Sequence, residues 1–240
     1  MAEHAYEYHF EAGRSRSPVL LYLHGYGESG GNLHVQVTNH GPWPQGKRVR
    51  NGNVQNEISG FFRVAPHLAK KGDTWDTEAL AELLAEIATK YESQIDPTHL
   101  FVAGISRGGW GALDLVAALG DKITAAAIFC PEKVTALEAA VGKAPVYLFH
   151  ASDDTIVRFD PPRRNIYDKV AGRADFRFRE LNLDQTFLDE NGAYHPHVCW
   201  THIFGHPQLY TWFELMKAEP RPAKDRWPEF ATLPFQAASH

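Results

Sequence analysis

Short apolar runs that end in turn residues alternate with segments of helical periodicity along most of this 240-residue chain. The runs expected to form buried strands are residues 18–25, 60–67 and 98–104, the stretches ITAAAIFCP and APVYLFHAS, and DFRFREL. The segments expected to form helices are residues 76–95, 109–119, about 132–141 and 160–171, and PQLYTWFELMKA. This alternation is typical of parallel strands joined by right-handed crossover helices. We therefore expect an α/β protein with a mostly parallel central sheet and helices on both faces.

The chain shows no linker that would divide it. Its composition is ordinary for a globular protein, with 44% hydrophobic and 22% charged residues. Because no stretch rich in Pro, Gly or Ser interrupts the pattern, we expect one domain over residues 1–240. Its core is expected to cover about residues 18–217, and the proline-rich residues 220–240 are expected to form an irregular tail.

Charge and targeting signals limit the partners. The net charge of −5 does not favour binding to nucleic acid, and two cysteines are too few for a disulfide framework. The start MAEHAYEYHFEAG lacks the basic and apolar regions of a secretory signal, and no apolar run reaches the roughly 18 residues of a membrane span. We expect a soluble cytoplasmic protein with no nucleic-acid or membrane partner.

Residues 104–108, Gly-Ile-Ser-Arg-Gly, match the pattern G-x-S-x-G. The string alone arises by chance in on the order of one chain in ten of this length, so its surroundings decide its meaning. Here a predicted strand precedes the string and a predicted helix follows it. That arrangement predicts a sharp turn that exposes Ser106 as a nucleophile, rather than a turn made only for packing.

A serine nucleophile needs a base and an acid that orients the base, and this fold places them downstream in the order acid, then histidine. Asp153 and Asp154 follow the strand APVYLFHAS, and the pattern does not choose between them. Five histidines come later: His195, His197, His202, His206 and His240. His195 and His197 lie in the loop before the last helix, whereas His202 and His206 lie closer to that helix, and the residues alone leave the choice open.

Two backbone N–H groups are needed to stabilise the oxyanion. One is expected from Arg107, directly after the nucleophile. The other is expected from the glycine-rich stretch LHGYGESGG, at Gly25 or Tyr26.

The histidines at 195–206 also raise a zinc hypothesis. No H-E-x-x-H helix and no set of carboxylates completes such a site in the sequence. Loop histidines near aromatic residues are the simpler interpretation, so we expect no metal and no organic cofactor.

With HGYG, GISRGG, HASDDTIV and HVCW in this order, the chain resembles the α/β-hydrolase superfamily over about residues 18–217. More narrowly, it is similar to the small serine esterases grouped with feruloyl and acetyl esterases, dienelactone-hydrolase-like proteins and prolyl-oligopeptidase-like peptidases. The resemblance implies an α/β-hydrolase fold with little or no cap domain. It implies Asp154 as the acid, in a G-x-x-D-x-x-V segment with Ala151 in place of the glycine. It implies His197 as the base, in H-x-x-W before L-Y-x-W.

The resemblance implies a serine hydrolase that cleaves a small-molecule carboxylic ester through an acyl-enzyme, of carboxylesterase type. A peptidase or an acyltransferase would use the same triad, and a non-catalytic hydrolase-like binding protein is an alternative of another class. The aromatic residues Trp75, Trp110 and Trp200 are candidate substrate contacts, although each such residue more often serves packing. A homo-oligomer is left open.

Two features depart from these relatives. Arg107 stands where methionine or glutamine is frequent, and its side chain either attracts an anionic substrate or pairs with a nearby carboxylate. The acidic segment from Asn182 to Tyr194 is long, which predicts an unusual leaving-group side.

Overall fold

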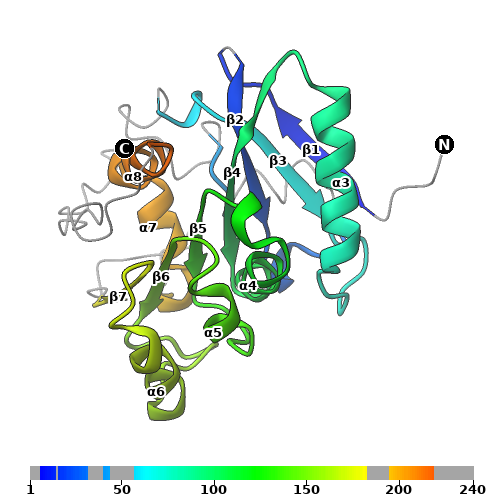
Figure 1. Cartoon of the computed structure of the whole chain (residues 1–240). Helices are drawn as coiled ribbons and strands as arrows, with labels where there is room; N and C mark the ends of the chain where they lie inside the picture. Colours follow the sequence, from blue (N-terminus) through cyan, green and yellow to red (C-terminus); the bar gives the residue numbers. More distant parts are fainter. Residues whose placement is uncertain (1–5, 15, 32–39, 44–56, 183–194, 219–240) are drawn as a thin grey trace, which may run out of the picture.

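The computed structural model describes residues 6–14, 16–31, 40–43, 57–182 and 195–218. Its strands form one seven-stranded sheet in the order β1-β3-β2-β4-β5-β6-β7 (Figure 1). The strands are β1 (Glu7–Glu11), β2 (Ser17–Leu23), β3 (Phe62–His67), β4 (Ile95–Ile105), β5 (Ala125–Phe129), β6 (Val146–Ala151) and β7 (Phe176–Leu181). β1 pairs antiparallel with β3, and the other neighbouring strands are parallel. The expected mostly parallel sheet is confirmed.

Helices cover both faces of this sheet. Those described are α3 (Thr77–Lys90), α4 (Arg107–Leu119), α5 (Leu137–Ala140), α6 (Pro161–Val170), α7 (Trp200–Phe204) and α8 (Pro207–Met216), with short 3-10 turns η1 (Tyr26–Glu28), η2 (Gly120–Lys122) and η3 (Pro196–Val198). Residues of α3 to α6 belong to one buried cluster, and residues of α7 and α8 belong to the other. The architecture is therefore that of an α/β-hydrolase fold.

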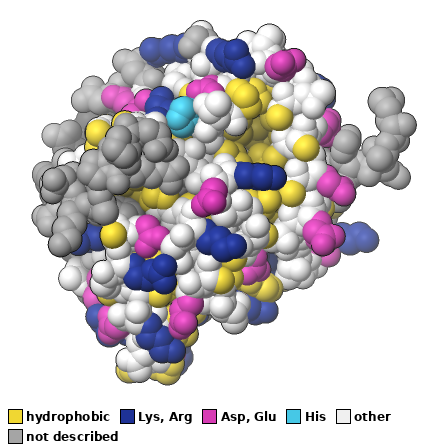
Figure 2. Space-filling model, viewed as in Figure 1, with side chains coloured by type: hydrophobic (Ala, Val, Ile, Leu, Met, Phe, Trp, Pro, Cys, Tyr) yellow, Lys and Arg dark blue, Asp and Glu magenta, His cyan; other side chains and the backbone are white. Residues whose placement is uncertain are grey.

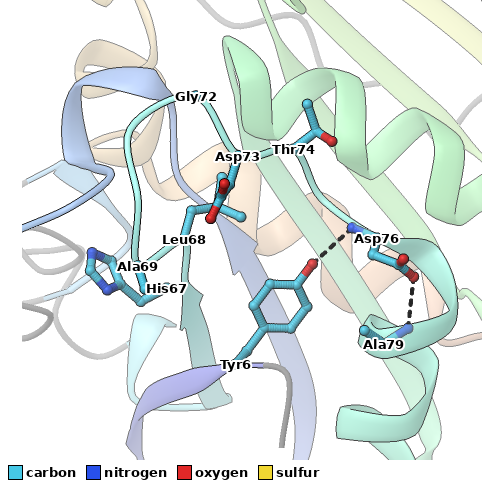
Figure 3. A pocket seen from close by; sticks show the side chains of 9 residues that line it. All are labelled: Tyr6, His67, Leu68, Ala69, Gly72, Asp73, Thr74, Asp76 and Ala79. Atoms are coloured by element: carbon cyan, nitrogen blue, oxygen red, sulfur yellow. Dashed lines mark hydrogen bonds between the residues drawn. The ribbon is translucent and has the colours of Figure 1, made fainter.

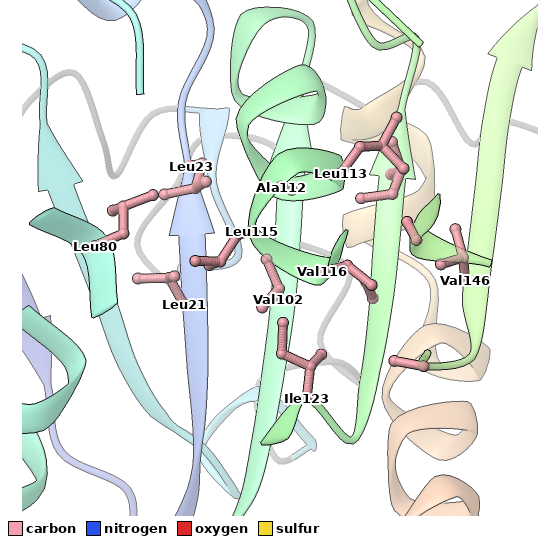
Figure 4. Close-up of a cluster of buried hydrophobic side chains, with 14 of the residues drawn as sticks. Leu21, Leu23, Leu80, Val102, Ala112, Leu113, Leu115, Val116, Ile123 and Val146 are labelled. Carbon is pink, nitrogen blue, oxygen red and sulfur yellow. The ribbon is translucent and has the colours of Figure 1, made fainter. Parts of the chain in front are cut away.

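The two clusters differ in chemistry. On the α4 face, aliphatic side chains from the helix interlock with those of the central strands, as Leu115 and Val116 do with Val102 in Figure 4. On the α8 face the cluster is aromatic, and the rings of Phe101 and Phe213 lie 4.7 Å apart. Both layers exclude water from the sheet, which gives the strand ends a fixed frame for the loops that follow them.

Helix α3 begins as predicted and ends earlier than predicted. The Asp76 carboxylate accepts hydrogen bonds from the backbone of Glu78 at 2.9 Å and Ala79 at 3.0 Å, which caps the helix. The helix stops at Lys90 because Ile95, expected to close it, starts β4 instead. Ile95 is 1% exposed and pairs with Ser17 of β2, so burial in the sheet outweighs the helical pattern.

Among the described strands and α-helices, two were not predicted, the edge strand β1 and the short helix α7. The predicted tail at 220–240 and most of the acidic segment before His195 lie outside the described residues. Within the described part of the chain, no helix is long and apolar enough to cross a bilayer. Acidic and basic side chains are interspersed on the face drawn in Figure 2.

Candidate active site

Ser106 lies at the turn between β4 and α4. Its backbone has φ 51° and ψ −113°, a conformation that non-glycine residues rarely adopt. Hydrogen bonds on both sides hold this turn: the Ser106 N–H donates to the carbonyl of Phe129 at 2.9 Å, and the Ser106 carbonyl accepts from Trp110 at 3.1 Å and Glu132 at 2.9 Å. The strained conformation is therefore fixed by the next strand and its loop.

The glycines on either side of Ser106 are required by close backbone contacts. A Cβ added to Gly104 would lie 2.2 Å from the carbonyl oxygen of Gly108. A Cβ added to Gly108 would lie 2.0 Å from the carbonyl oxygen of Leu23. Since both contacts are with backbone, a side chain at Gly104 would push the start of α4 away from β4, and a side chain at Gly108 would push it away from β2.

The side chains of Ser106, His197 and Asp154 form a continuous hydrogen-bonded chain. The Ser106 Oγ lies 3.1 Å from His197 Nε2, and His197 Nδ1 lies 2.7 Å from Asp154 Oδ2. All three residues are less than 10% exposed. With Nδ1–H donated to the carboxylate, Nε2 is left as the acceptor for the serine hydroxyl. Of the two aspartates that the pattern left open, Asp154 is the one bonded to His197.

Asp154 is held as a carboxylate by its surroundings. Its Oδ1 accepts hydrogen bonds from the backbone of Ile156 and Val157, each at 2.9 Å. Burial by itself raises the pKa of this carboxyl, but the hydrogen bonds from His150, His197 and the Val157 backbone outweigh it. The pKa of Asp154 is therefore well below its ordinary value, so the group is charged when it faces His197.

His150 is a second histidine on Asp154, and the sequence reasoning missed it. It is fully buried, and its Nε2 lies 2.8 Å from the Val157 carbonyl and 3.4 Å from Asp154 Oδ2. Its Nδ1 lies 3.0 Å from the Tyr167 hydroxyl. The available signal was its place at the end of a buried strand, four residues before Asp154.

The loop after β2 lies directly beside Ser106. An ideal Cβ on Gly25 would be 3.4 Å from Ser106 Cβ, so this backbone borders the nucleophile. His24 fixes the loop, since its Nδ1 lies 2.8 Å from the Gly25 carbonyl and its Nε2 accepts from the Leu68 N–H at 3.1 Å. Burial lowers the pKa of His24 to about 4, which keeps its Nε2 free to accept.

The two predicted oxyanion donors begin helical turns that face this space. Arg107 is the first residue of α4, and Tyr26 is the first residue of η1. Backbone N–H groups at such positions have no partner within their own helix. Both are therefore available in principle to a ligand, and Gly25 remains the alternative to Tyr26.

The three candidate aromatic contacts have different surroundings. Trp200 lies edge-on to His197, with ring centroids 5.2 Å apart. Trp110 carries the Lys133 ammonium 3.8 Å above its ring. Trp75 is 6% exposed, and its Nε1–H donates to the carbonyl of His24 at 3.3 Å. Of the three, Trp200 is the one in ring contact with the histidine of the hydrogen-bonded chain, whereas Trp75 packs beneath the loop of Tyr26.

The other histidines that the structure describes do not gather into a ligand set. His195 lies 6.4 Å from His197 and His202 lies 6.5 Å from His206, measured between ring centroids. Among the described residues, the one group of at least three His, Cys, Asp or Glu with donor atoms close enough for a shared ion consists of Cys130, Asp154 and His197. Two members of that group are already hydrogen-bonded to each other, so the described geometry favours the triad over a metal centre.

A cavity of about 500 Å³ lies beside the loop after β3 (Figure 3). The Tyr6 hydroxyl accepts a hydrogen bond from the Asp76 N–H at 2.8 Å at its wall, and His67 and Asp73 also line it. None of Ser106, Asp154 and His197 is among its lining residues. It is a separate cavity, lined mainly by the loop between β3 and α3.

Comparison with protein families identifies the family of the chain. Residues 57–179 match the model of the dienelactone hydrolase family. The chain belongs to the dienelactone hydrolase family. The matched region contains Ser106 and Asp154 but ends before His197, which was predicted from the H-x-x-W and L-Y-x-W pattern. This family is named for a hydrolase, and the chain has the α/β-hydrolase fold.

Solved structures of esterases share the fold of this family member. A thermostable esterase matches 86% of this chain with a TM-score of 0.67 and 23% identity. Est1E from Butyrivibrio proteoclasticus matches 86% of it with a TM-score of 0.55 and 13% identity, and the match spans 93% of Est1E. An acetyl xylan esterase from Aspergillus awamori matches 72% of this chain and 75% of its own, with a TM-score of 0.50 and 14% identity.

At these identities the structural matches establish the fold and not a substrate. The matched region spans 58% of the thermostable esterase. No curated protein sequence matches the chain. The choice of substrate must therefore be argued from the site itself.

Proposed function

We propose that this protein hydrolyses carboxylic esters through an acyl-enzyme on Ser106. The observation that carries the proposal is the hydrogen-bonded chain from Ser106 Oγ to His197 Nε2 at 3.1 Å and from His197 Nδ1 to Asp154 Oδ2 at 2.7 Å. A hydroxyl oriented on a neutral imidazole, which is itself oriented by a carboxylate, is the arrangement that activates serine as a nucleophile. Membership of a hydrolase family is consistent with that chemistry.

In the first step, Ser106 Oγ forms a bond to the ester carbonyl carbon while its proton moves to His197 Nε2. The carbonyl oxygen becomes an oxyanion, which the backbone N–H groups of Arg107 and of Tyr26 or Gly25 stabilise. Collapse of this intermediate breaks the bond to the alcohol oxygen, which takes the proton from His197. Asp154 stays ionised and stabilises the imidazolium that exists between these transfers.

In the second step, water attacks the acyl carbon and gives one proton to His197 Nε2. The tetrahedral intermediate then releases Ser106 Oγ, which recovers that proton, and the carboxylic acid leaves. A lactone is a cyclic ester, so the same steps open its ring, and the alcohol remains part of the product. The proposed mechanism therefore applies to a cyclic ester, as in the name of the family, and to a linear ester.

The test is the hydrolysis of short p-nitrophenyl esters and of a simple lactone by the wild-type protein and by Ser106→Ala. We expect the wild type to release acid from at least one of these esters and the variant to lose at least 10³-fold in kcat. Equal turnover by both proteins would refute the assignment of Ser106. Peptide substrates and added alcohol acceptors, assayed in parallel, separate an esterase from a peptidase or an acyltransferase with the same triad.

A further inference from the structure

The guanidinium of Arg107 is engaged on several sides. Its Nε donates to Glu132 Oε2 at 2.9 Å, and its Nη2 donates to the other carboxylate oxygen at 3.4 Å. Its Nη1 donates to the carbonyl of Asp73 at 3.2 Å. The Tyr26 ring stacks on it, with Cζ 4.6 Å from the ring centroid. These contacts use the planar, forked shape of arginine.

Through these contacts the Arg107 side chain joins three loops that surround Ser106. Tyr26 follows β2, Asp73 follows β3 and Glu132 follows β5. Because Arg107 is the residue after the nucleophile, it supplies one predicted oxyanion N–H, and its side chain stacks on Tyr26, which with its neighbour Gly25 is the candidate for the other. The distance between the two donors therefore depends on this side chain.

Glu132, which binds the Arg107 guanidinium, is itself held by hydrogen bonds. The backbone N–H of Glu132 donates to the Ser106 carbonyl at 2.9 Å. Arg163 donates from Nη1 to the Pro131 carbonyl at 2.8 Å and from Nη2 to the Glu132 carbonyl at 3.2 Å. These hydrogen bonds fix the backbone of Glu132 next to the Ser106 turn. The Glu132 carboxylate therefore holds the Arg107 guanidinium in one position.

The same contacts argue against a role of Arg107 as a receptor for an anionic substrate. Its side chain is 14% exposed, and the Glu132 carboxylate neutralises its charge in a two-point ion pair. An anion at this position would have to displace that carboxylate or compete with its charge.

We propose that Arg107 is a positioning residue of the oxyanion hole, acting by stacking on Tyr26 while bound to Glu132. This inference rests on the proposed function, because it assumes that Ser106 forms a tetrahedral intermediate. Loss of the guanidinium frees the loop of Tyr26, so one oxyanion donor is out of place when charge develops. Because the interaction matters in the transition state, its loss lowers kcat and leaves KM almost unchanged.

The experiment compares Arg107→Met and Arg107→Lys with the matched control Arg164→Met. Arg164, on α6, makes the same kinds of contact with residues that take no part in the proposed oxyanion hole, an ion pair with Glu180 at 2.9 Å and a stack on the Phe159 ring at 4.4 Å. Each protein is assayed with p-nitrophenyl acetate and with the anionic mono-p-nitrophenyl succinate. Affinity is also measured for a trifluoromethyl ketone, whose carbonyl carbon bonds to Ser106 Oγ and whose oxygen becomes an oxyanion.

We expect Arg107→Met to lower kcat about 10- to 100-fold on both esters, because displacing a donor costs less than the 10²–10³-fold of deleting one. The affinity for the ketone should decrease by a similar factor. For Arg107→Lys, both kcat and the affinity for the ketone should lie between those of wild type and Arg107→Met. Arg164→Met should stay within about twofold of wild type.

Two results would overturn the proposal. One is a loss confined to KM for the succinate ester, which would make Arg107 an anion receptor. The other is unchanged kcat and unchanged ketone affinity in Arg107→Met. Ser106→Ala run alongside separates these failures from failure of the proposed function, since the latter would leave hydrolysis intact in the absence of the serine. If Arg107→Met does not fold, Arg107→Lys alone gives the same two readouts.

Discussion

His197 Nε2 lies 3.1 Å from Ser106 Oγ although the two residues are 91 positions apart in the chain. The parallel sheet explains how they meet. Ser106 follows the carboxyl end of β4, Asp154 follows that of β6, and both strands end at the same edge of the sheet. His197 reaches this edge from η3, just before the helices of the opposite face.

Asp154 and Asp153 are neighbours with different predicted roles. Asp154→Asn removes the charge that orients His197 and stabilises its imidazolium, so we expect kcat on a good ester to fall by about 10³- to 10⁴-fold. Asp153→Asn, the same change one residue earlier, should stay within about threefold of wild type. Steady-state kinetics on the two variants give the answer, and a larger loss in Asp153→Asn would reverse the assignment.

His150 is expected to keep Asp154 in place. His150→Phe removes the ring nitrogens that face Asp154, Val157 and Tyr167, and we expect about a tenfold fall in kcat with little change in KM. His150→Gln, which keeps an N–H donor, should recover part of the loss. Rates must be divided by the fraction of active serine, titrated with a fluorophosphonate. If the corrected kcat of His150→Phe equals that of wild type, the residue serves stability alone.

The sequence predicted much of this site and left specific parts out. The strand, turn and helix around Ser106 follow local rules, because an apolar strand, the glycines of the motif and a helix start all lie within about twenty residues. The choice of Asp154 and His197 needed a family pattern, since short loops with several aspartates and histidines have no local rule that selects one.

The residues that the Arg107 side chain contacts could not be predicted, for a different reason. Whether its side chain meets a substrate or a carboxylate depends on which loops the sheet order brings beside α4. Tyr26, Asp73 and Glu132 are far apart in sequence and converge in the fold alone. The edge strand β1 is a different case, because Tyr6, Tyr8 and Phe10 alternate with Glu7, His9 and Glu11 in a period-2 pattern from which this strand could have been predicted.

A substitution at Gly108 tests how tightly the turn that holds Ser106 is packed. Gly108→Ala places a methyl group 2.0 Å from the Leu23 carbonyl, and neither backbone can yield without moving β2 or α4. We expect a loss of about 1–3 kcal/mol or more in the free energy of unfolding, together with reduced kcat. The control is Gly172→Ala, where nothing lies within 4 Å of the added carbon. Urea unfolding of both variants measures the difference, and equal stability would show that the turn has room for a side chain.

The lowered pKa of His24 leads us to expect that the stability of the folded protein depends on pH. Its pKa is lowered from 6.5 to about 4 in the folded protein, because burial disfavours the charged ring. The unfolded chain takes up a proton near pH 6.5 and the folded one does not, so this contribution is complete above that pH and is lost as pH falls toward 4. The loss is roughly 3 kcal/mol. In His24→Gln, urea unfolding at pH 7 and pH 4.5 should show a shallower fall than in wild type. Equal slopes would mean that His24 titrates normally.

The most direct measurement of the central claim is the mass of the intact protein after reaction with a fluorophosphonate, followed by peptide mapping. We predict the addition of one probe per chain, with the label on the peptide that contains Ser106 and at its hydroxyl. Ser106→Ala should remain unlabelled, and Asp154→Asn should react more slowly at the same position. A folded wild-type protein that takes no label, or takes it at another residue, would contradict the account of Ser106 as the nucleophile.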